Sequence, residues 1–362
     1  MFSSTKSKSI VGIDIEAATV AAVEVRADAA GRVLGHGIVP LEPGIVEDGE
    51  VGDDEALGAA VKQLLAKGKL GKHVRLGVGN RRVIAYTMRL PRIEDPKDLE
   101  AAVRFRASED LPMPLNEAIL DWRQLDPADP GNPGDEIEVL LVAAHRDMID
   151  RMIGAMRHAG ARLVGIDLAA FGMVRALGSA TSPGDEAEAE AGYADSGPAP
   201  ARMFCNFSDS LNLAVARGRD CVFVRVATGG IETIVDDLSG RLGMSAADAR
   251  QWLHHVGLTT AVDRIEGDPV VIENTREALV RGAGDLAREL RISLDSYAAQ
   301  DAATPVYEVV AGGPGVAISG LVEAVQVELG LPVSMVVPPA LANLDSAVAA
   351  RLATPYGLGR EE

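Results

Sequence analysis

The sequence is poor in cysteine, in aromatic residues and in positive charge. Two cysteines occur, Cys205 and Cys221, and aromatic residues make up 4% of the 362 positions. The cysteines have neither metal-ligand nor redox spacing and lie in β-rich segments, which predicts reduced, buried thiols in a cytoplasmic protein. Lysine and arginine number 35 against 53 acidic residues, a formal net charge of −18. Without a basic stripe, direct binding to nucleic acid or anionic lipid is disfavoured.

Long apolar runs and common catalytic motifs are also missing. No uninterrupted apolar stretch approaches the length of a membrane span, and no apolar segment that could serve as a signal peptide precedes Ser9. The six histidines show no metal-ligand spacing, and neither a nucleophile triad nor a Walker-type loop is present. What remains is a globular composition, 47% hydrophobic and 24% charged, in a chain long enough for two domains or lobes.

The chain is organised around its opening segment, Ser9 to Arg26. Two runs of β-branched apolar residues flank a short turn of small residues, which predicts two strands joined by a tight turn. Asp14 lies near the end of the first strand, where a carboxylate has no packing role. We therefore expect its side chain to face solvent, a metal or a ligand.

The first half of the chain reads as an α/β lobe interrupted by a small module. A third strand at 33–39, a helix ending near Gly68 and a strand at 74–78 are typical of one half of a nucleotide-binding fold. The segment 80–160 predicts an inserted α+β module, with a helix capped by Asp95 and an antiparallel pair of strands. Residues 1–79 and 161–181 then form the first lobe.

The second half repeats the opening pattern. The acidic segment 182–200 predicts a disordered linker, and 201–362 the second lobe, with 231–300 mostly helical and a last helix at 346–352. Asn206 occupies the place in the second hairpin that Asp14 occupies in the first. Two similar lobes predict a cleft between them, which is the usual place for a ligand.

Two kinds of residue in this cleft are candidates for binding. Asp14 and Asn206 could face a metal and its waters, although an amide cannot act as a general base. The glycines Gly229, Gly230, Gly312, Gly313 and Gly315 could bring backbone close to a phosphate or nucleoside, or could serve tight turns only. Glu16 adds a negative charge that repels phosphate by about 1 to 4 kcal/mol, so a purely structural hairpin stays open as an alternative.

One apolar pattern has a simpler interpretation. Met148, Met152 and Met156 recur at helical spacing, and this stripe predicts packing in the core rather than a partner groove.

Several segments, taken in order along nearly the whole chain, carry a family resemblance. They are Val11–Ile15 with Val23–Val25, Arg89–Pro91, Glu109–Leu115 with Leu120–Asp121, Val139–Ala144, Gly165–Phe171, Gly229–Ile234, Ser293–Tyr297 and Tyr356–Leu358. Together they resemble the bacterial actin-like ATPases, with an inserted module similar to that of FtsA, and more specifically the PilM family of type IV pilus assembly. The resemblance implies an α/β, actin-like, two-lobed fold of duplicated ribonuclease H-like halves.

The resemblance also implies a ligand and a partner. ATP and Mg²⁺ would bind between the lobes, at Asp14 and Thr19 of the first hairpin and at Asn206, Ser208 and Ser210 of the second, with Asp14 at the metal. Gly229, Gly230, Gly312, Gly313 and Gly315 would approach the nucleotide. The partner would be the short cytoplasmic tail of a PilN-like membrane protein, which places the chain at the inner face of the cell membrane.

The departures from the family pattern fall on the nucleotide positions. The first loop has Glu16, Ala17 and Ala18 in place of glycine and small hydroxyl residues, the common lysine is Ala21, and the common arginine of the long helix is Ile292. The second hairpin has Asn206-Phe207-Ser208 in place of Asp-x-Gly. These changes predict weak or absent ATPase activity.

Two functions follow, one of them an adaptor that binds the PilN-like tail with little ATP turnover and the other a nucleotide-switched ATPase. An FtsA-like division protein is a further alternative, although the residues from Pro355 to Glu362 cannot form the amphipathic membrane helix in which FtsA-like chains end. A sugar or acetate kinase is disfavoured, because the second hairpin lacks its carboxylate.

Overall fold

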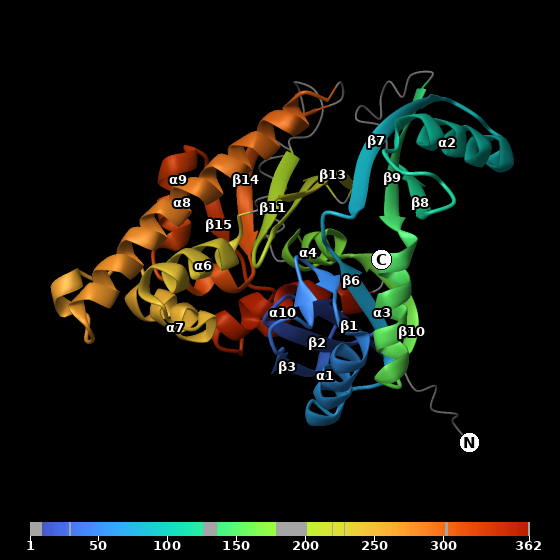
Figure 1. Cartoon of the computed structure of the whole chain (residues 1–362). Coiled ribbons are helices and arrows are strands. Elements are labelled where there is room, and N and C mark those ends of the chain that lie inside the picture. The colour runs from blue at the N-terminus through green and yellow to red at the C-terminus, as the bar shows by residue number, and fades with distance from the viewer. Residues whose placement is uncertain are drawn as a thin grey trace.

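The computed structural model describes residues 9–28, 30–125, 136–178, 201–218, 220–227, 229–300 and 303–360. The linker expected at 182–200 lies outside these residues. Within them, two five-stranded sheets form the centres of two lobes, and a smaller three-stranded sheet stands apart from both (Figure 1).

The two large sheets have the same strand order, which establishes the predicted duplication. In the first, β10-β6-β1-β2-β3, the hairpin β1–β2 continues into antiparallel β3, while β6 and β10 run parallel to β1. In the second, β13-β12-β11-β14-β15, the hairpin β11–β12 has the same neighbours. The strands are β1 (Ser9–Ile15), β2 (Thr19–Arg26), β3 (Val33–Pro40), β6 (His73–Val78), β10 (Arg162–Leu168), β11 (Ala201–Phe207), β12 (Leu211–Arg217), β13 (Asp220–Ala227), β14 (Val306–Gly312) and β15 (Val333–Met335).

Two helices lie between the sheets and join the lobes. They are α4 (Ala169–Gly178) and α10 (Ser346–Gly359), and they pack on each other. Because side chains alternate along a strand, Phe204 of β11 faces these helices in one core while Met203 and Cys205 face the opposite side in another. That opposite side is covered by the helices of the second lobe, which are α6 (Ile231–Leu242), α7 (Ala246–Val256), α8 (Pro269–Ala298) and α9 (Leu321–Leu329).

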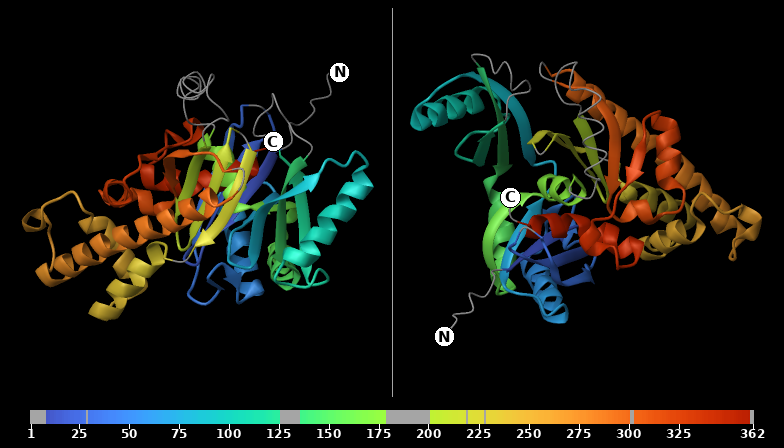
Figure 2. Two further views of the ribbon diagram at one scale, coloured as in Figure 1. Left: turned by 90° about the horizontal axis from the view of Figure 1, so that it is seen from above. Right: turned by 180° about the vertical axis from the view of Figure 1, so that it is seen from behind.

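The inserted module has a core of its own. Its sheet, β7-β9-β8, carries α2 on one face, and Figure 2 shows it projecting from the rest of the first lobe. The elements are β7 (Val83–Pro91), α2 (Pro96–Asp110), β8 (Ala118–Gln124) and β9 (Glu136–His145). The predicted cap is present, since the Asp95 carboxylate accepts hydrogen bonds from the backbone N–H groups of Lys97 and Asp98.

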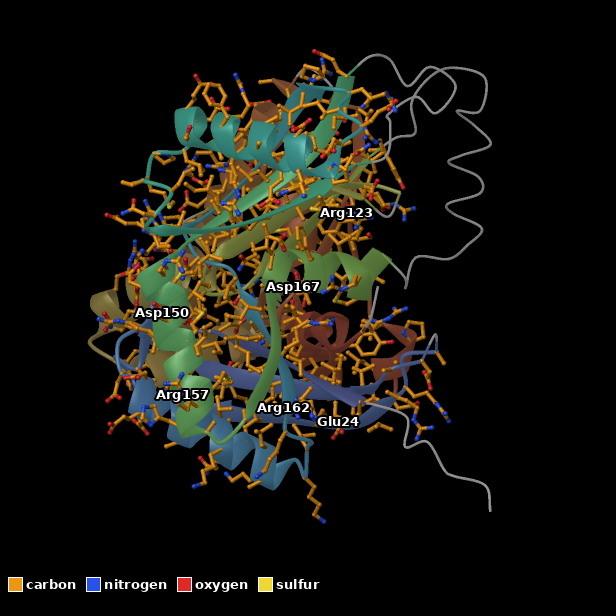
Figure 3. All side chains as sticks on the ribbon, turned by 90° about the vertical axis from the view of Figure 1, so that its right-hand side faces the viewer. Glu24, Arg123, Asp150, Arg157, Arg162 and Asp167 are labelled. Atoms are coloured by element: carbon orange, nitrogen blue, oxygen red, sulfur yellow. The ribbon has the colours of Figure 1, made fainter. Side chains whose placement is uncertain are left out.

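The last helix of the segment expected in the module packs elsewhere. This helix, α3 (Arg146–His158), lies against α1 (Asp54–Lys67), and its methionine stripe is buried in the core of the first lobe. The prediction of a core stripe at Met148, Met152 and Met156 is therefore confirmed. Figure 3 shows α3 and the edge strand β10 on one outer side of the lobe, with Arg157 and Arg162 low on it and Arg123 of β8 above.

The C-terminal helix differs most from the sequence analysis. The sequence predicts an end at Leu352, whereas α10 runs through Pro355 to Gly359 and is buried from Ala349 onward. The sequence also places this helix, within 201–362, in the second lobe, whereas its packing is mainly on β1, β2 and α4 of the first. The reason is close backbone contact, since a Cβ at Gly357 would overlap the Gly172 carbonyl oxygen and one at Gly12 would overlap the Pro355 carbonyl oxygen.

The remaining elements are short connections. They are β4 (Val46–Glu47), β5 (Glu50–Val51) and the single turns Val262–Arg264, Pro314–Ala317 and Pro339–Leu341. Among the described residues, no helix combines the length and the hydropathy needed to cross a bilayer.

The glycine contacts of α10 lead to a stability prediction. Gly357→Ala should lower the free energy of unfolding by about 1 to 3 kcal/mol or more, because the new methyl group meets the backbone of α4 and neither helix can yield locally. Gly284→Ala in α8 is the matched control: nothing lies within 4 Å of its Cβ position, so helix propensity should raise stability by up to about 1 kcal/mol. Urea unfolding measures both, and equal effects would contradict the packing argument.

Candidate functional site

The turns of the two hairpins meet at the centre of the molecule. The backbone N–H of Ala17, in the β1–β2 turn, donates a hydrogen bond to the carboxylate of Asp209, in the β11–β12 turn. Beside this contact lies a cavity of about 20 Å³. The cavity is lined by Asp14, Ile15, Glu16, Gly49, Gly79, Ala169, Asn206, Ser208, Asp209, Ser210 and Asn212.

The structure therefore brings four of the predicted site residues together. Asp14, Asn206, Ser208 and Ser210 all line this one cavity, from the two lobes. Three buried side-chain oxygens that line it have no hydrogen-bond partner, and these are Glu16 Oε1, Asn206 Oδ1 and Asn212 Oδ1. A cavity of this size and polarity suits about one water molecule.

Arg351 of α10 organises the site, and the sequence alone does not predict this role. Its Nη1 donates to Asp14 Oδ2 at 2.7 Å, and its Nε lies 3.1 Å from Glu16 Oε2 and 3.0 Å from the Thr19 hydroxyl. Its remaining contacts, at 3.4 Å, are to the carbonyl oxygens of Asp14 and Thr19. One signal could have found it, because Arg351 is the only charged residue between Asp345 and Arg360 in an otherwise apolar helix.

The expectation for Asp14 accordingly needs correction. Its side chain lines the cavity but does not face solvent, since it is 4% exposed and its carboxylate is paired with Arg351. The partner comes from a helix 337 positions away, which local sequence patterns do not reveal. Thr19 is likewise held by Arg351, and it is not among the residues that line the cavity.

The buried guanidinium of Arg351 faces the buried carboxyl groups of Asp14 and Glu16 and the half-buried one of Asp209, and the pKa values of Glu16, Asp209 and Arg351 are shifted. Burial raises the pKa of Glu16 to about 8, against the opposing effect of Arg351 and with further increases from Asp209 and Asp14. Burial, together with the charge of Glu232, raises the pKa of Asp209 to about 6, although the Ala17 N–H and Arg351 oppose the rise. Burial pulls the pKa of Arg351 down, but Glu16 and Asp14 outweigh it and the pKa is raised.

These pKa values change the expected role of Glu16. The sequence suggested a charge that repels phosphate, but a carboxyl group with a pKa of about 8 is mostly neutral near pH 7. Glu16 obstructs the turn by occupying it, since its side chain is buried there and contacts Arg351.

Four of the five predicted glycines, Gly230, Gly312, Gly313 and Gly315, lie against the second hairpin, whereas Gly229 lies nearest to Glu289 of α8. A Cβ at Gly313, whose φ is 84°, would overlap the Asn206 amide, and one at Gly315 would lie 2.6 Å from Ile231. Gly230 precedes α6 and lies against the carbonyl oxygens of Ser208 and Asp209. None of Gly229, Gly230, Gly312, Gly313 and Gly315 is among the residues that line the cavity.

The residues present do not fit a metal–nucleotide complex in this arrangement. The cavity of about 20 Å³ has room for about one water molecule and not for a nucleotide as the side chains stand. Asp14, the predicted metal residue, is engaged by Arg351, and the Ala17 N–H is engaged by Asp209. Across the described ranges, no group of three or more histidine, cysteine, aspartate or glutamate side chains could hold a metal ion. Cys205 and Cys221 are free and buried, as predicted.

The raised pKa of Glu16 predicts a pH dependence of stability. Because the folded chain holds a proton on Glu16 that the unfolded chain has lost, the free energy of unfolding should fall as the pH rises from about 5 to about 8. Glu16→Gln removes this proton exchange, so the variant should gain stability relative to the wild type between about pH 6 and about pH 9.

Chemical denaturation of the wild type and of Glu16→Gln at about pH 6 and about pH 9 measures this gain. Glu328→Gln, at an exposed position of α9, is the matched control and should follow the wild type at both. A difference between the wild type and Glu16→Gln that stays constant with pH would show that Glu16 is ionised throughout.

Comparisons with known proteins agree with this architecture. The solved structure of a PilM–PilN type IV pilus biogenesis complex matches with a TM-score of 0.77 and 23% identity, over 98% of each chain. The ethanolamine utilization protein EutJ from Carboxydothermus hydrogenoformans matches with a TM-score of 0.54 and 14% identity, over 97% of this chain and 89% of that one. MreB5 of Spiroplasma citri bound to ADP matches with a TM-score of 0.52 and 12% identity, over 97% of this chain and 95% of that one.

At these identities the solved structures show the fold, which is the actin-like two-lobed fold, and a nucleotide occupies one of them. The family model described as type IV pilus assembly protein PilM matches residues 12–355, which is nearly the whole chain. The chain therefore belongs to the PilM family of type IV pilus assembly proteins.

Proposed function

We propose that this protein is an adaptor of type IV pilus assembly that binds the cytoplasmic tail of a PilN-like inner-membrane protein, with little or no ATP turnover. The match to the family model over 12–355 carries this proposal. It is supported by the likeness to a chain whose solved structure is a PilM–PilN complex. The same match favours this identity over an FtsA-like division protein.

The proposed place of work is the inner face of the cell membrane, reached through the protein partner. The formal charge of −18 disfavours direct adsorption to anionic lipid, so the tail of the partner would supply the attachment. Binding of a short tail suits a rigid adaptor, because the chain then presents a preformed surface and loses little conformational entropy.

A nucleotide-switched ATPase is the second candidate. It is favoured by the fold shared with ADP-bound MreB5 and by the gathering of Asp14, Asn206, Ser208 and Ser210 at one cavity. In that case ATP and Mg²⁺ would bind between the lobes, with Asp14 at the metal. Opening the cleft would first require Arg351 to release Asp14 and Asp209 to release Ala17, which supports the adaptor over the switch.

Isothermal titration of the full chain with a synthetic peptide of the PilN tail tests the adaptor proposal. We expect saturable binding with a Kd in about the micromolar range, changed less than about threefold by millimolar MgATP. A peptide of the same composition in scrambled order is the control. Absence of binding with and without MgATP would overturn the adaptor, and binding that requires MgATP would favour the switch.

A further inference from the structure

The turn of the first hairpin is held from two sides by groups of this chain. On the side of α10, Arg351 contacts Asp14, Glu16 and Thr19 at 2.7 to 3.1 Å. From the facing lobe, the Asp209 carboxylate accepts the N–H of Ala17. The carboxyl groups of this turn could bind a cation and its N–H could bind an anion. In this chain Arg351 and Asp209 already occupy these two positions.

The cation position is filled by a guanidinium. Asp14 and Arg351 are 4% and 6% exposed, so their ion pair is shielded from water. Hard divalent ions need several oxygen ligands around them, and the Asp14 oxygen nearest to Arg351 already accepts its Nη1–H at 2.7 Å. A metal ion bound to Asp14 would therefore lie next to the buried positive charge of Arg351, which would repel it.

The anion position is filled by a carboxylate. Backbone N–H groups in tight turns bind anions such as phosphate oxygens, and here Asp209 supplies the anion from the opposite lobe. The same contact ties the lobes together, since Ala17 belongs to the hairpin of the first sheet and Asp209 to that of the second. Two further ion pairs connect the inserted module to the second lobe, Arg123–Asp220 at 3.1 Å and Arg217–Glu138 at 3.4 Å.

We propose that Arg351 and Asp209 stand in for a bound cation and a bound anion, so that an internal ion cluster closes the cleft of this chain without nucleotide. This explains why a fold that occurs with bound nucleotide in MreB5 has, in this chain, site residues that are engaged with one another. The proposal is independent of tail binding, because it concerns only what holds the lobes together.

The first test replaces the cation. Arg351→Met leaves Asp14 and Glu16 without their guanidinium, so millimolar MgCl₂ should raise the Tm of the variant by about 3 °C or more. The wild type should respond to neither MgCl₂ nor MgATP. Arg288→Met, an exposed arginine paired with Asp285 on α8, is the control and should behave as the wild type. A wild type stabilised by MgATP, or a folded Arg351→Met variant that ignores Mg²⁺, overturns the proposal.

The second test replaces the anion and decides the matter if Arg351→Met does not fold. In Asp209→Ala, the Ala17 amide should exchange with solvent on the order of tenfold faster, because its acceptor is gone and the contact between lobes is lost. Inorganic phosphate should slow that exchange in the variant and leave the wild type unchanged. Asp285→Ala is the control. Unchanged exchange at Ala17, or no effect of phosphate on the variant, overturns the proposal.

Discussion

The guanidinium of Arg351 lies beside the first hairpin, where the carboxyl groups of Asp14, Glu16 and Asp209 surround one positive charge. Removing one partner of a buried ion pair leaves an uncompensated charge and typically costs about 3 to 5 kcal/mol. This charge joins α10 to the end of β1 and to the turn that contacts the facing lobe through Ala17. An arginine suits the position because it stays ionised when buried and donates in several directions from one plane.

This arrangement separates the fold from the chemistry that such folds perform elsewhere. Each lobe keeps the five-stranded sheet with its central hairpin, and α4 and α10 fix the lobes against each other. The polar residues at the turns contact one another across the cleft. An adaptor requires one preformed binding surface more than a conformational change. A cleft filled by side chains of the chain itself favours a single arrangement of the two lobes.

Much of the architecture could be predicted from sequence because it rests on local patterns. Alternating apolar residues located the hairpins, Asp95 and Pro96 located the start of α2, and the repeated turn at Ser208 revealed the second lobe. The extent of α10 could not be predicted, because Pro355 and the following glycines argue for an end and only distant backbone contacts preserve the helix. For the same reason the partner of Asp14 was missed, since no local rule connects it to Arg351. The cleft could be located, but what occupies it depended on contacts between residues hundreds of positions apart.

The placement of α10 has a consequence for how the protein is made. Strand β1 is among the first elements to be synthesised, yet Arg351, which pairs with its Asp14 carboxylate, and the glycines of α10 that pack on its face follow about 340 residues later. At roughly 5 to 20 residues per second, the ribosome needs on the order of 20 to 70 seconds to supply them. During that time the face of the first lobe that α10 later covers is exposed, and water solvates the carboxyl groups that Arg351 later pairs with. The core of the first lobe is therefore completed only after nearly all of the chain has been synthesised.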